Sequence, residues 1–310
     1  MRLSWAASAV ALYAILGVQL AMPSAGLETV SAESLTISNV IQYLRATPTG
    51  TKLLARAQRR WKLRSLEELV SRLKWSAVSR TDAVLTRHLD AHTGEEVRDR
   101  EVTIYLKRHP QAVDTILDLA HELTHAVANP HWDPYDPELT VGKYIWHAIE
   151  GEGGEVDAVV SECQVALEIS QANTRGGPRV SEERCARYLT WDKVAGRVDR
   201  TRVQQDFYKV GGLKSRITDM LGREAGMFPL LSGARAELFS STGKSPYPAA
   251  LAEEFHEMNR MACVNTRKRF TLLRSPASEM AQPNRSDRVR SRESTLRFLS
   301  KRCGSIDWSG

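Results

Sequence analysis

Apolar residues recur every three or four positions over long parts of the chain, a spacing that predicts helices with one buried face. The first such stretch runs from about residue 34 to residue 75, with a break expected at Thr47-Pro48-Thr49-Gly50. Past residue 180 the pattern is again mostly helical. The chain is therefore expected to be helical at both ends of its globular part.

Strand-like stretches lie between these helical parts. The segments 83–85 and 102–106 are rich in aliphatic and β-branched residues, which favour strands. The polar segment 90–100 between them contains Thr93-Gly94 and is typical of a hairpin connection. Together with the helices, these strands predict an α+β fold.

The segment 110–129 predicts a helix that carries the chemistry of the chain. Its apolar residues form one stripe, and prolines lie at both of its ends. His121 and His125 are four residues apart, so both imidazoles lie on the same side of the helix, one turn apart. Glu122 lies beside them. The sequence His-Glu-Leu-Thr-His therefore predicts a two-histidine metal site with a neighbouring carboxylate.

Zinc is the cofactor that this pattern indicates. A catalytic zinc takes neutral imidazole nitrogens and keeps one position open for a water molecule, whose pKa falls to about 7. Glu122 would then act as the general base that takes a proton from this water and passes it to a leaving amine. The alternative interpretation is two structural histidines on an amphipathic helix.

A third protein ligand is needed for such a site, and two patterns commonly supply it. A third histidine six residues later is excluded here, because Pro130 interrupts the helix before His131. A glutamate on a following helix fits better, since a new helix is expected to start at Glu155 after a glycine-rich break. Three alternatives for this ligand stay open: Glu150, Glu152 and Glu162.

The segment from His121 to the start Glu155-Val156-Asp157-Ala158 resembles the zinc metallopeptidases of the gluzincin type, the thermolysin-like zincins. The resemblance covers roughly residues 101–170. It implies a zincin-like core, made of a small sheet and the active-site helices, with a mainly helical carboxyl-terminal region. It also implies that the strand 102–106 is an edge strand beside the site.

The resemblance leaves two roles open. The gluzincin pattern places an aspartate where this chain has Val159, so the side chain that orients a histidine is not identified; Asp118 is either such an orienting carboxylate or a solvated helix residue. A donor to the oxyanion is also required, and four residues are candidates for it. They are Tyr144, His147, Tyr247 and His256.

Charge and export signals indicate where the protein acts. Met1-Arg2 followed by an uncharged apolar run predicts a signal peptide over residues 1–25, and hence a secreted or periplasmic protein; an uncleaved membrane anchor is the alternative. Export favours two disulfides among Cys163, Cys185, Cys263 and Cys303, whose pairing the spacing does not rank. We expect Cys303 to tether the carboxyl terminus.

The chain has 43 basic and 37 acidic residues, and much of the excess lies between residues 260 and 302. This charge predicts a solvated flank that makes at most weak contact with an anionic envelope surface. Nucleic acid is not an expected partner, because no reader motif accompanies the charge.

These observations divide the chain into four parts. They are a signal peptide (1–25), a zincin-like catalytic core (33–170), a helical region that completes the cleft (171–274), and a basic, partly disordered tail (275–310). The expected function is zinc-dependent hydrolysis of amide bonds in a protein or peptide substrate, with peptidoglycan peptides included. The alternative is a non-catalytic zinc-binding protein or a helical envelope-binding protein with a basic tail.

Overall fold

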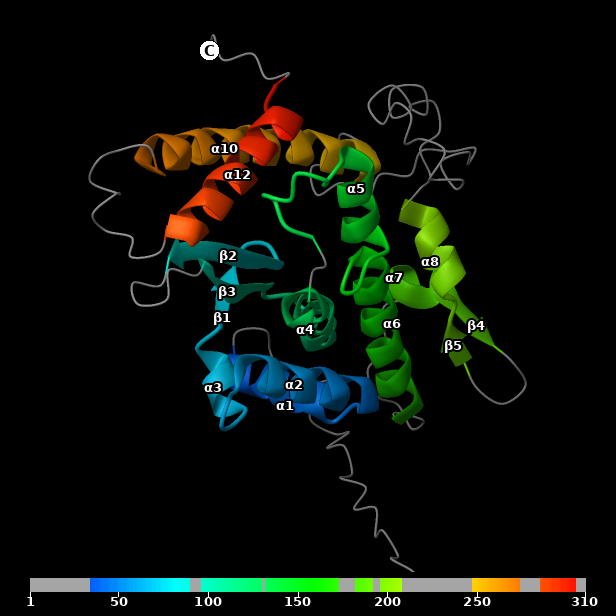
Figure 1. The fold of residues 1–310 in the computed structure, drawn as a ribbon. Coiled ribbons are helices and arrows are strands. Elements are labelled where there is room, and N and C mark those ends of the chain that lie inside the picture. Colours follow the sequence, from blue (N-terminus) through cyan, green and yellow to red (C-terminus); the bar gives the residue numbers. More distant parts are fainter. Residues whose placement is uncertain are drawn as a thin grey trace, which may run out of the picture.

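The computed structural model describes residues 34–89, 96–129, 132–172, 182–191, 196–207, 247–273 and 285–304, and the predicted signal peptide lies outside them. The described part is mixed α+β, mostly helical with a small sheet, as the sequence predicted (Figure 1). The elements in chain order are α1 (Ile37–Arg45), α2 (Pro48–Trp61), α3 (Glu67–Val70), β1 (Leu73–Ser76), β2 (Arg80–Leu89), β3 (Glu96–Lys107), α4 (Ala112–Val127), α5 (Val141–Ile149), α6 (Glu155–Ala172), α7 (Glu182–Cys185), the 3-10 helix η1 (Ala186–Tyr188), β4 (Leu189–Trp191), β5 (Gly196–Val198), α8 (Arg200–Phe207), α10 (Tyr247–Leu273) and α12 (Arg285–Arg302).

The predicted break at residues 47–50 is the beginning of α2. Thr47 caps the helix, because its side chain accepts a hydrogen bond from the backbone N–H of Gly50, and Pro48 occupies the first helical position. The turn between α1 and α2 is thus short. Thr49 is also bound by Glu168 of α6, whose carboxylate accepts from the Thr49 backbone N–H at 2.9 Å and from its hydroxyl at 2.6 Å. This contact fastens α6 to the amino-terminal helices.

The larger sheet has the order β1-β3-β2, with β1 parallel and β2 antiparallel to β3. The antiparallel pairing of β2 and β3 confirms the predicted hairpin. Two other predictions were wrong. Residues 73–76 form a strand and not a helix, because pairing with β3 buries Leu73 against the core. The segment 102–106 is in the central strand, and the strand beside α4 with an outer edge in the described sheet is β2.

Helix α4 lies in the middle of the described structure, between the amino-terminal helices, the sheet and α6 (Figure 1). Its side chains are buried on nearly every side, and Leu117, Leu119 and Leu123 have no exposed surface. The sequence predicted a single apolar stripe, which is typical of a surface helix. Neighbours on all sides explain why polar residues of α4 are buried as well.

The end of α4 is set by its sequence and by the sheet. Ala128 is extended, and Asn129 precedes a proline, a position that disfavours helical backbone. Arg100 of β3 donates a hydrogen bond to the Ala128 carbonyl oxygen at 2.9 Å. The last turn, which carries His125, is therefore held against the sheet.

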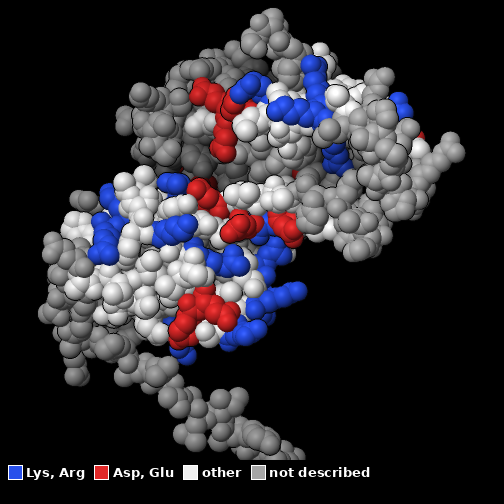
Figure 2. Space-filling view, turned by 90° about the vertical axis from the view of Figure 1, so that its left-hand side faces the viewer, with Lys and Arg blue, Asp and Glu red and all other residues white. Residues whose placement is uncertain are grey.

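The carboxyl-terminal half contains more than helices. Strands β4 and β5 form a two-stranded antiparallel sheet that the helical pattern did not predict. The region 275–294 showed no periodic apolar signal, yet residues from Arg285 onward form α12, which packs on α10 through Phe298 and a disulfide. On the face shown in Figure 2, Lys and Arg side chains are interspersed with Asp and Glu side chains.

Both predicted disulfides are present. Cys163 pairs with Cys185, and Cys263 pairs with Cys303, so the last described helix is tethered to α10 as the position of Cys303 suggested. Within the described ranges, no helix is both long enough and apolar enough to cross a membrane.

Candidate metal centre

The side chains of His121, His125 and Glu155 converge between α4 and α6. The Nε2 atom of His121 lies 3.3 Å from Glu155 Oε2, and Nε2 of His125 lies 3.7 Å from the same oxygen. One potential ligand atom from each residue lies within 4.8 Å of the other two, a separation that suits coordination of one ion. The structure thus brings together the three residues that the sequence selected.

His121 is held from its other ring nitrogen. Its Nδ1 lies 2.9 Å from Oε2 of Glu162, a buried carboxylate on α6. A carboxylate accepts, so Nδ1 carries a hydrogen, and Nε2, which faces Glu155, is the ring nitrogen that could bind a metal ion after losing its proton. This outer carboxylate is the orienting group that Val159 could not supply, and it lies one turn further along α6.

His125 is held in the same way by a backbone group. Its Nδ1 donates a hydrogen bond to the carbonyl oxygen of Gly153 at 2.7 Å. Gly153 has φ +68°, and a Cβ atom at this position would lie 2.1 Å from Ala128 Cβ. Only glycine fits both the left-handed backbone and this close approach to α4. The glycine-rich break before α6 therefore serves to orient a histidine.

Glu122 lies beside the cluster but is turned toward the sheet. Its side chain is buried, and its Oε2 accepts a hydrogen bond from the Thr81 hydroxyl of β2 at 2.8 Å. The same hydroxyl lies 2.9 Å from the Glu122 backbone oxygen. Glu122 thus stands next to the cluster without being part of it.

Burial and charge pairing set the protonation of these groups. Burial alone would lower the pKa of both imidazoles, but the neighbouring carboxylates outweigh it, so the pKa of His121 lies well above its usual value and that of His125 is also raised. Burial alone would raise the pKa of Glu155, but the two histidines hold it well below its usual range. Burial raises the pKa of Glu122. The negatively charged carboxylate of Glu155 and the more basic carboxylate of Glu122 therefore lie near each other.

Comparison with protein families, with curated proteins and with solved structures found no match for this chain. The residues of the cluster are therefore interpreted from their geometry and from chemical principles.

The residues present fit a zinc ion. Two imidazoles and one carboxylate form the donor set of many catalytic zinc sites, which leave one further position for water. Both outer ring nitrogens already have acceptors, which fixes the tautomer that a metal ligand needs. All three residues of this donor set lie within the described ranges.

The other glutamates considered as third ligand have different partners. Glu150 binds Gln204, and Glu152 forms an exposed ion pair with Arg56 at 2.8 Å. Glu162 supports His121 from its outer side. Among these four carboxylates, only that of Glu155 lies between the two Nε2 atoms.

The candidates for the oxyanion donor have varied surroundings. Tyr144 is buried between Trp132 and Phe255, and burial raises the pKa of its hydroxyl. His256 is exposed and contacts Phe255. The ring of His147 contacts Trp146, and Tyr247 begins α10. These contacts select none of the four.

A third layer of side chains lies behind Glu162. Arg184 of α7 binds Glu162 through Nε and Asp118 of α4 through Nη2. Asp118 also binds the hydroxyl of Ser79 and lies 2.9 Å from Nε2 of His109. Asp118 is thus buried and paired, and it supports Arg184 and not His121. No local pattern in the sequence indicates a role for Arg184, because its position depends on the pairing of Cys185, which the sequence does not reveal.

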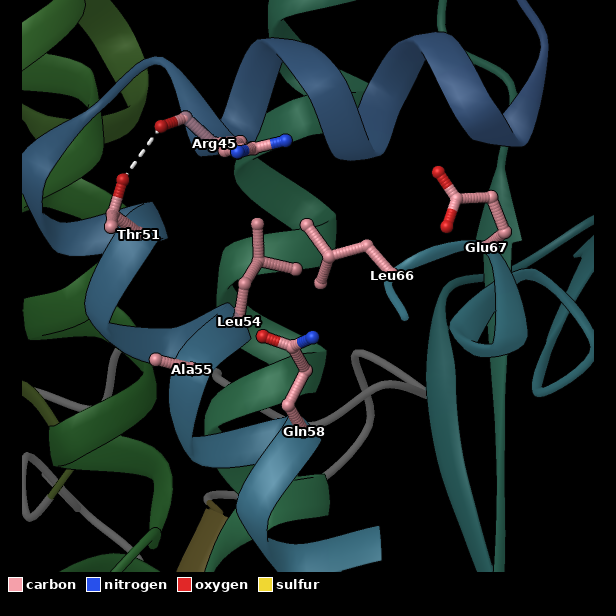
Figure 3. Close-up of a pocket in the computed structure, with 7 residues that line it drawn as sticks. All are labelled: Arg45, Thr51, Leu54, Ala55, Gln58, Leu66 and Glu67. Atoms are coloured by element: carbon pink, nitrogen blue, oxygen red, sulfur yellow. Dashed lines mark hydrogen bonds between the residues drawn. The ribbon is translucent and has the colours of Figure 1, made fainter. Parts of the chain in front are cut away.

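A separate pocket of about 330 Å³ lies between α1, α2 and α3, where Leu54 and Leu66 face each other (Figure 3). It shares no residue with the metal cluster. Its lining consists of Arg45, Thr51, Leu54, Ala55, Gln58, Leu66 and Glu67. The hydroxyl of Thr51 donates to the Arg45 carbonyl oxygen at 2.6 Å, which closes one end of this pocket.

Proposed function

We propose that this protein is an exported zinc metallopeptidase with a zincin-like core, in which His121, His125 and Glu155 hold the metal. One observation carries the proposal: three potential ligand atoms, from His121, His125 and Glu155, converge, while a second acidic side chain, that of Glu122, stands beside them bound to Thr81. A purely structural zinc site has four protein ligands and no need of a neighbouring base.

Bound zinc would supply a Lewis acid and a water molecule of lowered pKa. The chain's own residues would do the rest. Glu122 would receive the proton of the attacking water at its free carboxylate oxygen and deliver it to the nitrogen of the leaving amine. Its raised pKa favours both transfers, since a base matched to the working pH can also act as an acid.

Thr81 would keep the Glu122 carboxylate in one orientation during these transfers. The outer partners Glu162 and Gly153 would keep both imidazoles facing the ion. Positioning of this kind is a large part of catalysis, because the reacting atoms must meet within a narrow range of distances.

The substrate class follows from this chemistry. An amide bond needs both an activated water and a proton for its leaving nitrogen, and the arrangement offers both. Proteins, short peptides and peptidoglycan cross-links all contain such bonds. Two disulfides support action outside the reducing cytosol.

The substitution Glu122→Gln tests the proposal. It keeps the size of the side chain but removes the base, so hydrolysis of a fluorogenic peptide library should fall at least about 100-fold. Metal content by mass spectrometry should stay at one zinc per chain, while His121→Ala should lose the zinc. The control is Glu152→Gln, which removes an exposed carboxylate outside the cluster and should keep full activity.

Three results would contradict the proposal. Wild-type protein without bound zinc would exclude the metal site. Zinc retained in His121→Ala would place the metal elsewhere. Zinc binding with peptide hydrolysis that Glu122→Gln leaves intact would refute the assigned base and favour a non-catalytic zinc protein with a contaminating activity.

A further inference from the structure

Two pairs of neighbouring residues face each other across α6 and α7. Glu162-Cys163 lies on α6 and Arg184-Cys185 on α7, and the cysteines form a disulfide with their Cα atoms 5.4 Å apart. The covalent bond therefore lies directly next to an ion pair between Arg184 and Glu162. Cross-link and ion pair connect the same two helices at the same level.

Arg184 contacts both helices of the metal site. Its guanidinium binds Glu162 of α6 and Asp118 of α4, whose side chains are only 7% and 8% exposed. Buried carboxylates require a partner, and a guanidinium is suited to hold two of them because its donors point in fixed directions. Arg184 therefore neutralises two buried charges and fixes both side chains.

The carboxylate of Glu162 has two oxygens with separate partners. Oε1 accepts from Arg184, and Oε2 faces Nδ1 of His121. Among the described residues, Arg184 is the hydrogen-bond partner of Oε1. Without it, the carboxylate could rotate and move Oε2 away from the imidazole. The orientation of His121 thus depends on a residue that does not touch it.

We propose that Arg184 is a positioning residue of the metal site and that the Cys163–Cys185 disulfide holds it there. The proposal rests on the metal site proposed above and deepens it. It assigns the disulfide a role in metal affinity besides its role in stability. The short helix α7 thereby becomes part of the site, although it contributes no ligand.

Zinc affinity, measured by competition with a chromophoric chelator, tests this proposal in the full chain. Removing an outer partner of a metal ligand typically weakens metal binding 10- to 100-fold, so Arg184→Gln should weaken zinc about tenfold. Replacing both Cys163 and Cys185 by alanine should weaken it to a similar degree. Combining the three substitutions should cost little more than either change alone, because both act through Glu162.

The chain supplies matched controls. Cys263 and Cys303 form a second disulfide, which closes a longer loop than the first. Its replacement by two alanines should destabilise the fold at least as much, yet leave zinc affinity within about twofold. Arg187→Gln removes the same charge from the same segment, where Arg187 lies 3.4 Å from Asp206, and should also leave the affinity unchanged.

A spectroscopic readout separates positioning from general destabilisation. Cobalt bound in place of zinc reports the ligand geometry through its visible absorption, and this spectrum should change in Arg184→Gln but not in Arg187→Gln. Should Arg184→Gln not fold, Arg184→Lys keeps the charge without the two-pronged geometry. We expect it to bind zinc with intermediate affinity and to show a smaller spectral change.

The possible outcomes distinguish the role of Arg184 from the metallopeptidase proposal. Folded Arg184 variants with wild-type zinc affinity and cobalt spectrum would overturn this inference while leaving the metallopeptidase proposal intact. Equal weakening by the two disulfide replacements would also overturn it, since the effect would then be general. A wild-type protein that binds no zinc would overturn both proposals, and zinc binding without peptide hydrolysis would overturn the peptidase assignment alone.

Discussion

The substitution Gly153→Ala should damage the metal site without touching a ligand. The added Cβ would lie 2.1 Å from Ala128 Cβ and 3.0 Å from the Thr124 carbonyl oxygen, so the two segments must separate by more than about 1 Å to reach an ordinary contact. The residue would also keep a left-handed backbone at φ +68°, which costs about 1–2 kcal/mol for a side chain with a Cβ.

The movement has a direct consequence for His125. Its Nδ1 is 2.7 Å from the Gly153 oxygen, and a shift of about 1 Å takes the pair out of hydrogen-bond range. Loss of an outer partner should weaken zinc about 10- to 100-fold. Strain and overpacking together should lower the free energy of unfolding by roughly 2–5 kcal/mol.

Two assays measure these effects. Chelator competition gives the zinc affinity, and urea unfolding of the metal-free protein, followed by circular dichroism, gives the stability. Gly304→Ala serves as the control, because a Cβ there would meet Ser300 oxygen at an ordinary 3.6 Å. A Gly153→Ala protein with unchanged zinc affinity and unchanged stability would refute the role given to the Gly153 carbonyl.

Two further predictions concern the groups around the cluster. Thr81→Val should lower kcat about tenfold and leave the zinc affinity unchanged, because it removes only the hydrogen bond to the Glu122 carboxylate. An unchanged kcat in steady-state kinetics would exclude a role for Thr81 in positioning Glu122. Burial would raise the pKa of Asp118, but Arg184, together with hydrogen bonds to Ser79 and His109, outweighs burial and holds this pKa below the usual 3.8. The stabilisation is therefore present above that pH and is lost as pH falls through the lowered pKa. Asp118→Asn should therefore cost about 2 kcal/mol of unfolding free energy at neutral pH, and the difference from wild type should shrink below about pH 4; a difference that grows on acidification would contradict the pairing.

The convergence of His121, His125 and Glu155 could be predicted from the sequence because its signals are local. His121 and His125 are one helical turn apart, and the glycine-rich break announces the helix that begins with Glu155. The sequence predicts Glu162 only as an alternative ligand, although its spacing of seven residues from Glu155 places it two turns further on the same side of α6. That spacing is a signal for an orienting role.

Other parts of the structure depend on contacts that no local pattern carries. Arg184 reaches the site through one of three disulfide pairings that the spacing could not rank. Strand β1 has a helical spacing of apolar residues, but the neighbouring β3 imposes an extended conformation on it. Helix α12 has a very polar sequence, and the tether between Cys263 and Cys303 keeps it on α10. In each case a contact with a residue distant in sequence determines the local structure.

The carboxyl-terminal helices also brace the glycine break from a distance. The ring of Phe255 of α10 contacts the ring of Tyr144 of α5 in a tilted arrangement, and α5 ends only a few residues before Gly153. Removing α10 and α12 from the chain would expose this aromatic face of α5 to solvent and remove a contact that holds α5 in position. The segment around Gly153 would then lose support, although His121, His125 and Glu155 would all still be present.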